Sequence, residues 1–243
     1  MGPVEYDKNQ NGGSKGRGPI NNWIIMMAII DEAKRLKKNV YLFFGDLVKC
    51  FDRLWLRDCL VDLHQAGVRE REIRLIYKLN EKAVFKVVTP VGTTGERTVK
   101  EIVKQGTVFG PKLCCASTGK INEGNEMQTT VYPNVQVQAL TFVDDIESLG
   151  SRNVVQGTIS NCVKMEKEKL WEFSTDKSNW MCIQNGKEPV NNIDMSVKQG
   201  KLKKVDKYKY LGNVVNEKGN MDAQFELMEK SKLEFPAIFI SQL

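Results

Sequence analysis

The spacing of hydrophobic residues changes several times along the chain and predicts a mixture of helices and strands. Apolar residues recur every three or four positions between residues 21 and 38, which predicts a helix. The run Val40–Phe44 consists of strand-forming residues and ends at Gly45-Asp46, which predicts a buried strand. The same reasoning predicts helices at 53–65, 69–79, 109–119 and 154–170, a hairpin of 85–89 with 98–103, and strands at 135–143, 146–149, around Phe173 and Met181, and at 208–215.

The order of these elements indicates the fold class. Helices alternate with strands, and some of the strands form antiparallel hairpins, which favours an α+β domain. No repeat of fixed period is present, and 243 residues are enough to bury a substantial core.

Composition and charge narrow the class of protein only a little. The net charge of +6 is a mild bias toward polyanionic partners such as nucleic acid. The longest apolar run, Trp23–Ile30, is too short to span a bilayer, and the first twenty residues are polar and glycine-rich. We therefore expect a soluble, intracellular protein with no membrane partner, in either nucleus or cytoplasm.

The cysteines and the single histidine disfavour two kinds of site. No Cys-x-x-Cys pair occurs, and His64 is the only histidine, so a Cys/His zinc site or a Ser-His or Cys-His hydrolase is not expected. We predict that His64 lies on a helix surface and that all six cysteines are buried, reduced thiols.

Three aspartates are the candidates for chemistry. Asp46 ends the first predicted strand, and Asp144 and Asp145 interrupt a later hairpin at its tip. Taken alone, two aspartates at a hairpin tip are more often only a turn. If the two strands are neighbours, however, the carboxylates converge, repel one another and raise a pKa, and they offer the oxygen ligands that Mg²⁺ prefers.

Three segments in a fixed order resemble motifs A, B and C of reverse transcriptases. They are Phe43–Asp52, Lys104-Gln105-Gly106 followed by Pro111 and Leu113, and Phe142–Asp145. The Phe-x-Asp-x-x-Lys-x-Phe-Asp form of the first is similar to non-LTR (LINE-like) retrotransposons rather than retroviruses. Segments similar to the flanking motifs 2a, D and E are Arg17-Gly18, Lys177 and Tyr210-Leu211-Gly212.

The resemblance covers residues 11 to 220 and implies a fold and a reaction. The fold is an α+β right-hand polymerase core with a ferredoxin-like palm, partial fingers and the beginning of a thumb. Residues 1–38 would be partial fingers, 39–204 the palm with a fingers insertion near 69–104, and 205–243 the primer-grip hairpin and start of the thumb. The reaction is addition of deoxynucleotides to a primer 3′-hydroxyl on an RNA or DNA template, with two Mg²⁺ ions (Mn²⁺ also possible).

The resemblance also implies a role for individual residues, each with a simpler alternative. Metal binding falls to Asp46 and Asp144, with Asp145 in support and the Leu47 carbonyl as a further ligand. Phe51 would exclude ribonucleotides as a steric gate, or it is core packing. Lys177 would donate a proton to pyrophosphate, or it is only solvated. Gln105 and Gly106 would line the nucleotide pocket, or they form a turn. Arg17 would contact the template, or it is only solvent-exposed. Tyr210-Leu211-Gly212 would contact the primer, or it is an ordinary strand that ends in a turn.

The chain departs from the pattern of the family at several points. Asn21-Asn22 stands where related elements commonly carry an aspartate, and Ser174-Thr175-Asp176 differs from the usual approach to Lys177. Early fingers segments and most of a thumb are expected to be missing. Two alternatives therefore accompany a truncated polymerase core: a catalytically incomplete retrotransposon remnant that only binds nucleic acid, and an intron-encoded maturase-type enzyme. Asp52 is interpreted as a helix N-cap rather than a catalyst.

Overall fold

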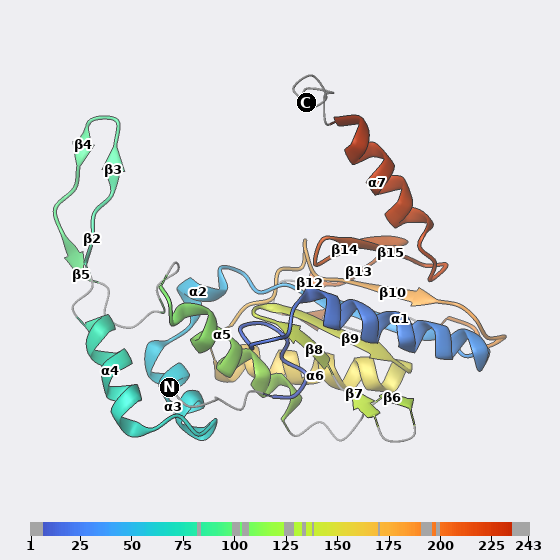
Figure 1. Ribbon diagram of the computed structural model, residues 1–243, viewed down its shortest axis with the longest axis horizontal. Coiled ribbons are helices and arrows are strands. Elements are labelled where there is room, and N and C mark those ends of the chain that lie inside the picture. The colour runs from blue at the N-terminus through green and yellow to red at the C-terminus, as the bar shows by residue number, and fades with distance from the viewer. Residues whose placement is uncertain are drawn as a thin grey trace, which may run out of the picture.

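A five-stranded sheet lies at the centre of the molecule (Figure 1). The computed structural model describes residues 7–81, 84–98, 103, 107–123, 129–132, 135–137, 139–169, 171–190, 196–197 and 200–234. Across the sheet, the strands run in the order β13 (Lys203–Lys204), β10 (Asn179–Ile183), β1 (Val40–Gly45), β9 (Asp145–Gly150) and β8 (Ala139–Phe142).

The connectivity of four of these strands is ferredoxin-like. In chain order they are β1, β8, β9 and β10, and their spatial order β10-β1-β9-β8 places the first strand between the fourth and the third. All three neighbouring pairs are antiparallel. Helices separate β1 from β8 and β9 from β10, so the pattern is β-α-β-β-α-β. The predicted α+β class and ferredoxin-like sheet are confirmed.

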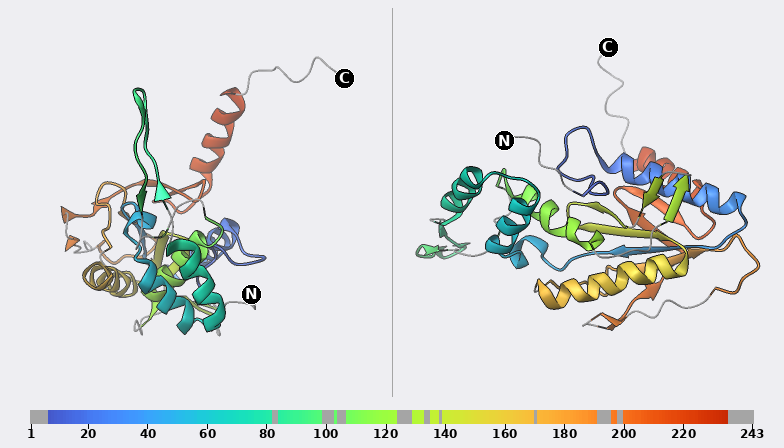
Figure 2. Two further views of the ribbon diagram at one scale, coloured as in Figure 1. Left: turned by 90° about the vertical axis from the view of Figure 1, so that its left-hand side faces the viewer. Right: turned by 90° about the horizontal axis from the view of Figure 1, so that it is seen from below.

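Both faces of the sheet are covered, which is why the central strand β1 has all six residues buried. One face packs on α3 (Leu56–Gln65), α5 (Gly110–Thr118) and α6 (Arg152–Glu168). The other packs on α1 (Pro19–Arg35) and on the hairpin of β14 (Lys207–Tyr210) and β15 (Asn213–Asn216). Figure 2 shows the sheet between α1 and α6.

Local signals set the ends of the two longest helices. Helix α1 begins at Pro19, whose fixed φ and missing N–H suit a first helical position. Helix α6 begins after Ser151, whose hydroxyl accepts a hydrogen bond from Val154 N. Every third or fourth residue of α1 is buried against the sheet, including Trp23, Met26 and Ile30, as its spacing predicted.

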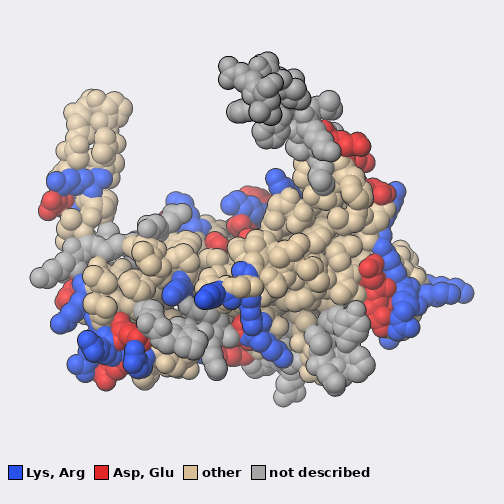
Figure 3. Space-filling model, viewed as in Figure 1, with Lys and Arg blue, Asp and Glu red and all other residues tan. Residues whose placement is uncertain are grey.

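Two elements project from the same side of this body and leave an open space between them (Figures 1 and 3). One is a long hairpin whose paired strands are β2 (Val84–Phe85) with β5 (Arg97–Thr98) and β3 (Val88–Thr89) with β4 (Gly92–Thr93). The other is α7 (Asp222–Glu234). The remaining elements are α2 (Cys50–Arg53), α4 (Glu70–Glu81), the 3₁₀ turn Gly119–Asn122, β6 (Thr129–Tyr132), β7 (Val135–Val137), β11 (Ser196–Val197) and β12 (Gly200–Lys201).

The helix predicted at 53–65 is wrong at its start. The chain forms two helices, α2 and α3, because Leu54 between them is extended and its carbonyl accepts a hydrogen bond from the distant Val103 N. Asp52 is not an N-cap, since it lies inside α2 and Lys49 occupies the capping position. The strand predicted at 135–143 is also two strands, with β7 pairing to β6 and β8 pairing to β9.

The cysteine and histidine predictions agree with the structure. All six cysteines are buried and none is in a disulfide, and His64 is exposed near the end of α3. In the described part of the chain, no helix combines the length and the hydrophobicity needed to cross a membrane.

Candidate active site

The ends of β1 and β9 bring the predicted aspartates together. The antiparallel register pairs Gly45 with Ile146. Asp46, which follows Gly45, is therefore opposite Asp145, which precedes Ile146. Phe142 pairs with Asp145, which leaves Val143 and Asp144 as a two-residue hairpin turn. Asp144 is therefore at the hairpin tip, while Asp145 is the first residue of β9 rather than part of the tip.

Backbone hydrogen bonds fix the segment that carries Asp46. The Asp46 N–H donates to the Ser178 hydroxyl at 3.0 Å, and the Asp46 carbonyl accepts from Ser174 N at 2.9 Å. Val48 N donates to Glu172 O at 2.8 Å, so Leu47 is bridged to Phe173 and its side chain is buried. Ser178 is fully buried, and nothing in the sequence marked it as part of the site.

The Asp46 carboxylate is poised to take a cation. Its Oδ1 atom is shielded from solvent and accepts no hydrogen bond from the described residues. The Lys177 ammonium lies 3.6 Å from this atom, and its side chain is 71% exposed. An exposed, flexible ammonium in this position is easily displaced by a more strongly charged ion. Lys177 is thus brought to the site, as predicted.

Burial and charge repulsion raise the pKa values of Asp144 and Asp145. Burial raises the pKa of Asp144, and repulsion from Asp46 raises it further. Burial and then the charges of Asp144 and Asp46 raise the pKa of Asp145 to about 6, an effect that Lys177 opposes. Such mutual repulsion favours binding of a cation that neutralises it.

The chemistry of these donors fits a hard divalent ion, although the side chains are not yet arranged around one. Three carboxylates repel one another, and Asp46 presents an unbonded oxygen. Among the residues that the structure describes, however, no three His, Cys, Asp or Glu side chains form a group that could hold a metal ion as they stand.

Of three further predicted residues, the structure describes only Phe51. Phe51 is the second residue of α2, five positions after Asp46, and is half-buried against the core beneath the sheet. It therefore contributes to packing while part of the residue stays accessible. Gln105 and Gly106 lie outside the described residues.

The predicted primer-contacting hairpin packs beside the aspartates. Tyr208 stacks on Phe44 at 4.2 Å between ring centroids, and Phe44 shares a sheet face with Asp46. Tyr210 is buried, and its phenol accepts a hydrogen bond from Asn22 at 2.7 Å. Leu211 and Gly212 form the turn between β14 and β15, both at positive φ (46° and 89°), as a primed hairpin turn requires.

Arg17 is bound to backbone in this structure. Its guanidinium donates to Lys8 O at 2.7 Å and reaches Gln10 O at 3.5 Å. The contacts hold the glycine-rich segment of residues 12–18 against the segment before it. A contact between Arg17 and template stays a prediction.

Gly12 is required by a close approach to the hairpin turn. A Cβ atom on Gly12 would lie 2.4 Å from Val143 N, whereas one on Gly18 would meet nothing within 4 Å. We expect Gly12→Ala to lower the free energy of unfolding by about 1–3 kcal/mol, as overpacking does, in urea denaturation. The matched variant Gly18→Ala, in extended backbone of the same loop, should stay close to the native value. Equal stabilities of the two variants would contradict this.

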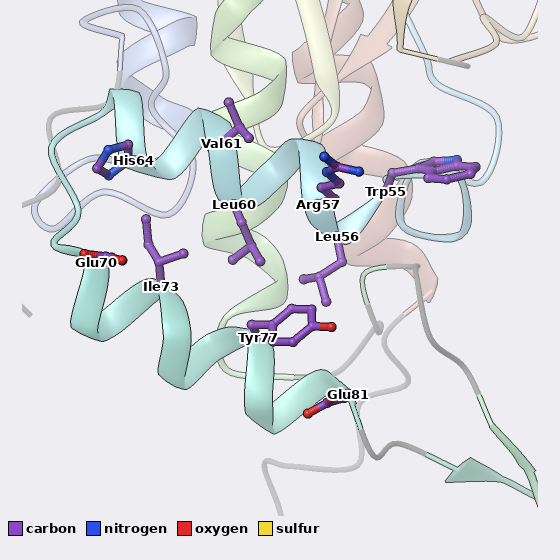
Figure 4. Close-up of a pocket in the computed structure, with 10 residues that line it drawn as sticks. All are labelled: Trp55, Leu56, Arg57, Leu60, Val61, His64, Glu70, Ile73, Tyr77 and Glu81. Carbon is purple, nitrogen blue, oxygen red and sulfur yellow. The ribbon is translucent and has the colours of Figure 1, made fainter.

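A well-formed pocket of the described structure lies away from the three aspartates. It lies between α3 and α4, has a volume of about 970 Å³, and is lined by side chains that include Leu60, Ile73 and Tyr77 (Figure 4). Asp46 and the hairpin tip do not line it. The aspartates therefore form the candidate site on their chemistry and not on cavity volume.

Comparison with solved structures supports the fold. The chain is similar to telomerase from Candida tropicalis in complex with a TWJ fragment of telomeric RNA (TM-score 0.54, 15% identity, 83% of this chain, 33% of that one). It is also similar to telomerase from Candida albicans in complex with such a fragment (0.54, 11%, 85% and 34%). A third match is apo Candida tropicalis telomerase truncated from its C-terminal domain (0.51, 13%, 80% and 38%). The chain thus spans about a third of the length of these telomerases, and the likeness is one of fold: a polymerase palm.

Comparison of sequences identifies the family. No curated protein matches the chain. Residues 5–215 match the family described as "Reverse transcriptase (RNA-dependent DNA polymerase)", a span that includes all three aspartates and every other residue of the candidate site. The chain belongs to the reverse transcriptase (RNA-dependent DNA polymerase) family.

Proposed function

We propose that this chain is the catalytic core of an RNA-directed DNA polymerase, of the non-LTR, LINE-like kind, which adds deoxynucleotides to a primer 3′-hydroxyl. The observation that carries the proposal is the placement of Asp46 opposite Asp145, beside the Asp144 turn, at one end of the central sheet. The form of the Asp46 segment supports the LINE-like subclass. Residues 1–38, 39–204 and 205–243 are proposed as partial fingers, palm, and primer grip with the start of a thumb.

Asp46, Asp144 and Asp145 are the residues that would hold Mg²⁺, or Mn²⁺ in its place. The ions, when bound, would activate the primer 3′-hydroxyl and neutralise the departing pyrophosphate. The protein's part is to hold the backbone that carries the three carboxylates, at the ends of β1 and β9 and in the turn between β8 and β9, in a fixed arrangement. The Leu47 carbonyl, next to Asp46 on a segment pinned by Ser174 and Glu172, is proposed as a further ligand.

Lys177 has a second role in this proposal. Its ammonium lies 3.6 Å from Asp46 Oδ1. An ion bound at Asp46 would repel it, and the exposed side chain is long enough to turn toward the leaving pyrophosphate and donate a proton there. Its backbone carbonyl accepts hydrogen bonds from Tyr208 and Asn179 at 3.2 and 2.8 Å, so the base of the side chain is anchored.

The remaining roles concern substrate and nucleic acid. Gln105 and Gly106 are proposed to line the nucleotide pocket, by resemblance alone. Tyr210-Leu211-Gly212 is proposed to grip the primer, and Arg17 to approach the template. The partners would be a DNA primer on an RNA or DNA template, and dNTPs. The Candida tropicalis and Candida albicans telomerases bound to an RNA fragment support an RNA partner.

Phe51 gives a test of nucleotide selection. A ring five residues after Asp46 would clash with a ribose 2′-hydroxyl, so Phe51→Val should weaken discrimination between dNTP and rNTP by about 10- to 200-fold in kcat/KM. Leu56→Val, at a buried apolar position, is the control for loss of packing. Selection unchanged in Phe51→Val would leave Phe51 with a packing role alone.

The proposed reaction itself is tested with the native chain on poly(rA)/oligo(dT). Labelled dTTP should be incorporated with Mg²⁺, incorporation should stop with EDTA, and Mg²⁺ added in excess should restore it. A folded chain that binds the primer-template but incorporates nothing would refute the polymerase proposal for this chain. It would instead support a protein that only binds nucleic acid.

A further inference from the structure

The hairpin turn that carries Asp144 has an unfavourable backbone conformation. Val143, the first residue of the turn, has φ of 59°, a region that β-branched residues rarely adopt because Cβ crowds the backbone. Such a conformation persists only when surrounding contacts enforce it.

Gln10 holds this turn from the opposite end of the sequence. Its side chain is fully buried, and its amide bonds both polar backbone groups of Val143. Oε1 accepts from Val143 N at 3.1 Å and from Gly12 N at 2.8 Å, while Nε2 lies 3.5 Å from Val143 O. The segment around Gln10 is itself fixed to β8, since Asn11 N donates to Thr141 O and Thr141 N donates to Asn9 O.

Thr118, on α5, hydrogen-bonds both Gln10 and Val143. Its hydroxyl donates to Val143 O at 2.6 Å and accepts from Gln10 Nε2 at 3.0 Å. The Val143 peptide is therefore held by two side chains from separate elements, and both of these side chains are buried. A buried network whose members are all bonded fixes a single geometry, because any shift would leave an uncompensated polar group.

We propose that Gln10 is a positioning residue for the metal site: it fixes the Val143–Asp144 turn so that the Asp144 carboxylate is presented toward Asp46. This inference rests on the proposed function, because it assigns to Gln10 a role in metal binding. Gln10 would touch neither metal nor substrate. Removing a group that orients a metal ligand typically lowers metal affinity or activity by about 10- to 100-fold.

The alternative is that Gln10 only stabilises the fold, and a matched control separates the two. Asn122, in the 3₁₀ turn Gly119–Asn122, also has a buried side-chain amide that bonds β8. It bonds Ala139 at the other end of that strand, accepting from Ala139 N at 3.0 Å and donating to Ala139 O at 3.2 Å. Gln10→Met and Asn122→Leu each remove a buried amide with little change of shape. A second variant, Thr118→Val, weakens the same turn from α5, should Gln10→Met fail to fold.

The experiment measures Mn²⁺ affinity by electron paramagnetic resonance and amide exchange at Val143 by NMR, with unfolding monitored for each variant. Gln10→Met and Thr118→Val should speed exchange at Val143 and lower Mn²⁺ affinity, by about 10- to 100-fold for Gln10→Met. Asn122→Leu should lose stability and keep Mn²⁺ affinity within about twofold of native, since it leaves the turn intact. In nucleotide addition, kcat should fall in Gln10→Met with KM for dNTP unchanged.

Three results would overturn the inference. One is native Mn²⁺ affinity in a folded Gln10→Met or Thr118→Val variant; another is an equal loss in Asn122→Leu. A native chain that binds no Mn²⁺ also overturns it. A native chain that binds Mn²⁺ at a site weakened by Gln10→Met, yet incorporates no nucleotide, would refute only the polymerase proposal and leave the positioning role of Gln10 standing.

Discussion

Asp46→Asn is expected to lower the rate of Mg²⁺-dependent nucleotide addition by a factor on the order of 10³ or more, because it removes a charged metal ligand. The substitution preserves size, and the Asp46 backbone bonds to Ser178 and Ser174 do not involve the carboxylate. It also removes the negative charge of Asp46 that repels Asp144 and Asp145, so the fold should be retained.

Single-turnover incorporation of one dNTP measures this effect without interference from product release. The matched control is Asp52→Asn, which removes an exposed carboxylate from α2 only six residues away. The control should retain the native rate within about threefold, as surface substitutions generally do. An Asp46→Asn variant that keeps more than about a tenth of the native rate would exclude Asp46 as an essential metal ligand.

The second large effect is expected on stability, through Glu147. This residue lies on β9, opposite Phe44, and its side chain is fully buried. Burial raises the pKa of Glu147 from 4.5 to about 8, and the neighbouring Tyr210 phenol offsets this only in part. The folded chain therefore keeps Glu147 protonated at neutral pH, while the unfolded chain ionises it.

The sign of the pH dependence follows from this difference. Below pH 4.5 Glu147 is protonated in both states, and its contribution to stability is greatest. Between pH 4.5 and about 8 unfolding releases a proton, so the free energy of unfolding falls by about 1.4 kcal/mol per pH unit from this residue. Above about pH 8 the contribution is constant.

Glu147→Gln should remove this dependence. We expect urea unfolding of the native chain to show a loss of a few kcal/mol between pH 5 and pH 8.5 that the variant does not show. The control Asp31→Asn, at an exposed position of α1, should follow the native profile. Parallel pH profiles of the native chain and Glu147→Gln would show that Glu147 is ionised, or reached by water, in the folded state.

The parts of the site that the sequence predicted correctly are encoded locally. The apolar run that forms β1 and the residues around Asp144 are contiguous, and strand propensity alone places Asp46 at a strand end and Asp144 at a tip. Their convergence needed only that β1 and β9 be neighbours. Family resemblance supplied that expectation, and the ferredoxin-like order of the sheet bears it out.

The residues that sequence analysis missed depend on contacts between distant parts of the chain. Gln10 bonds Val143 across 133 positions, and Ser178 accepts from Asp46 N across 132. Gln10 lies in a polar, glycine-rich segment whose composition predicts a loop, and Ser178 follows an ordinary turn. The break between α2 and α3 has the same origin, since Val103 competes for the Leu54 carbonyl. Local periodicity carries no signal for any of these.

The most direct test of the central claim compares the native chain with Asp144→Asn in Mg²⁺-dependent incorporation of dTTP on poly(rA)/oligo(dT), with folding of both verified by circular dichroism. We expect incorporation by the native chain and a loss of several orders of magnitude in the variant, because the substitution removes a proposed metal ligand. Equal incorporation by the two proteins would contradict the assignment of the site. No incorporation by a folded native chain would contradict the claim that this core is a polymerase by itself.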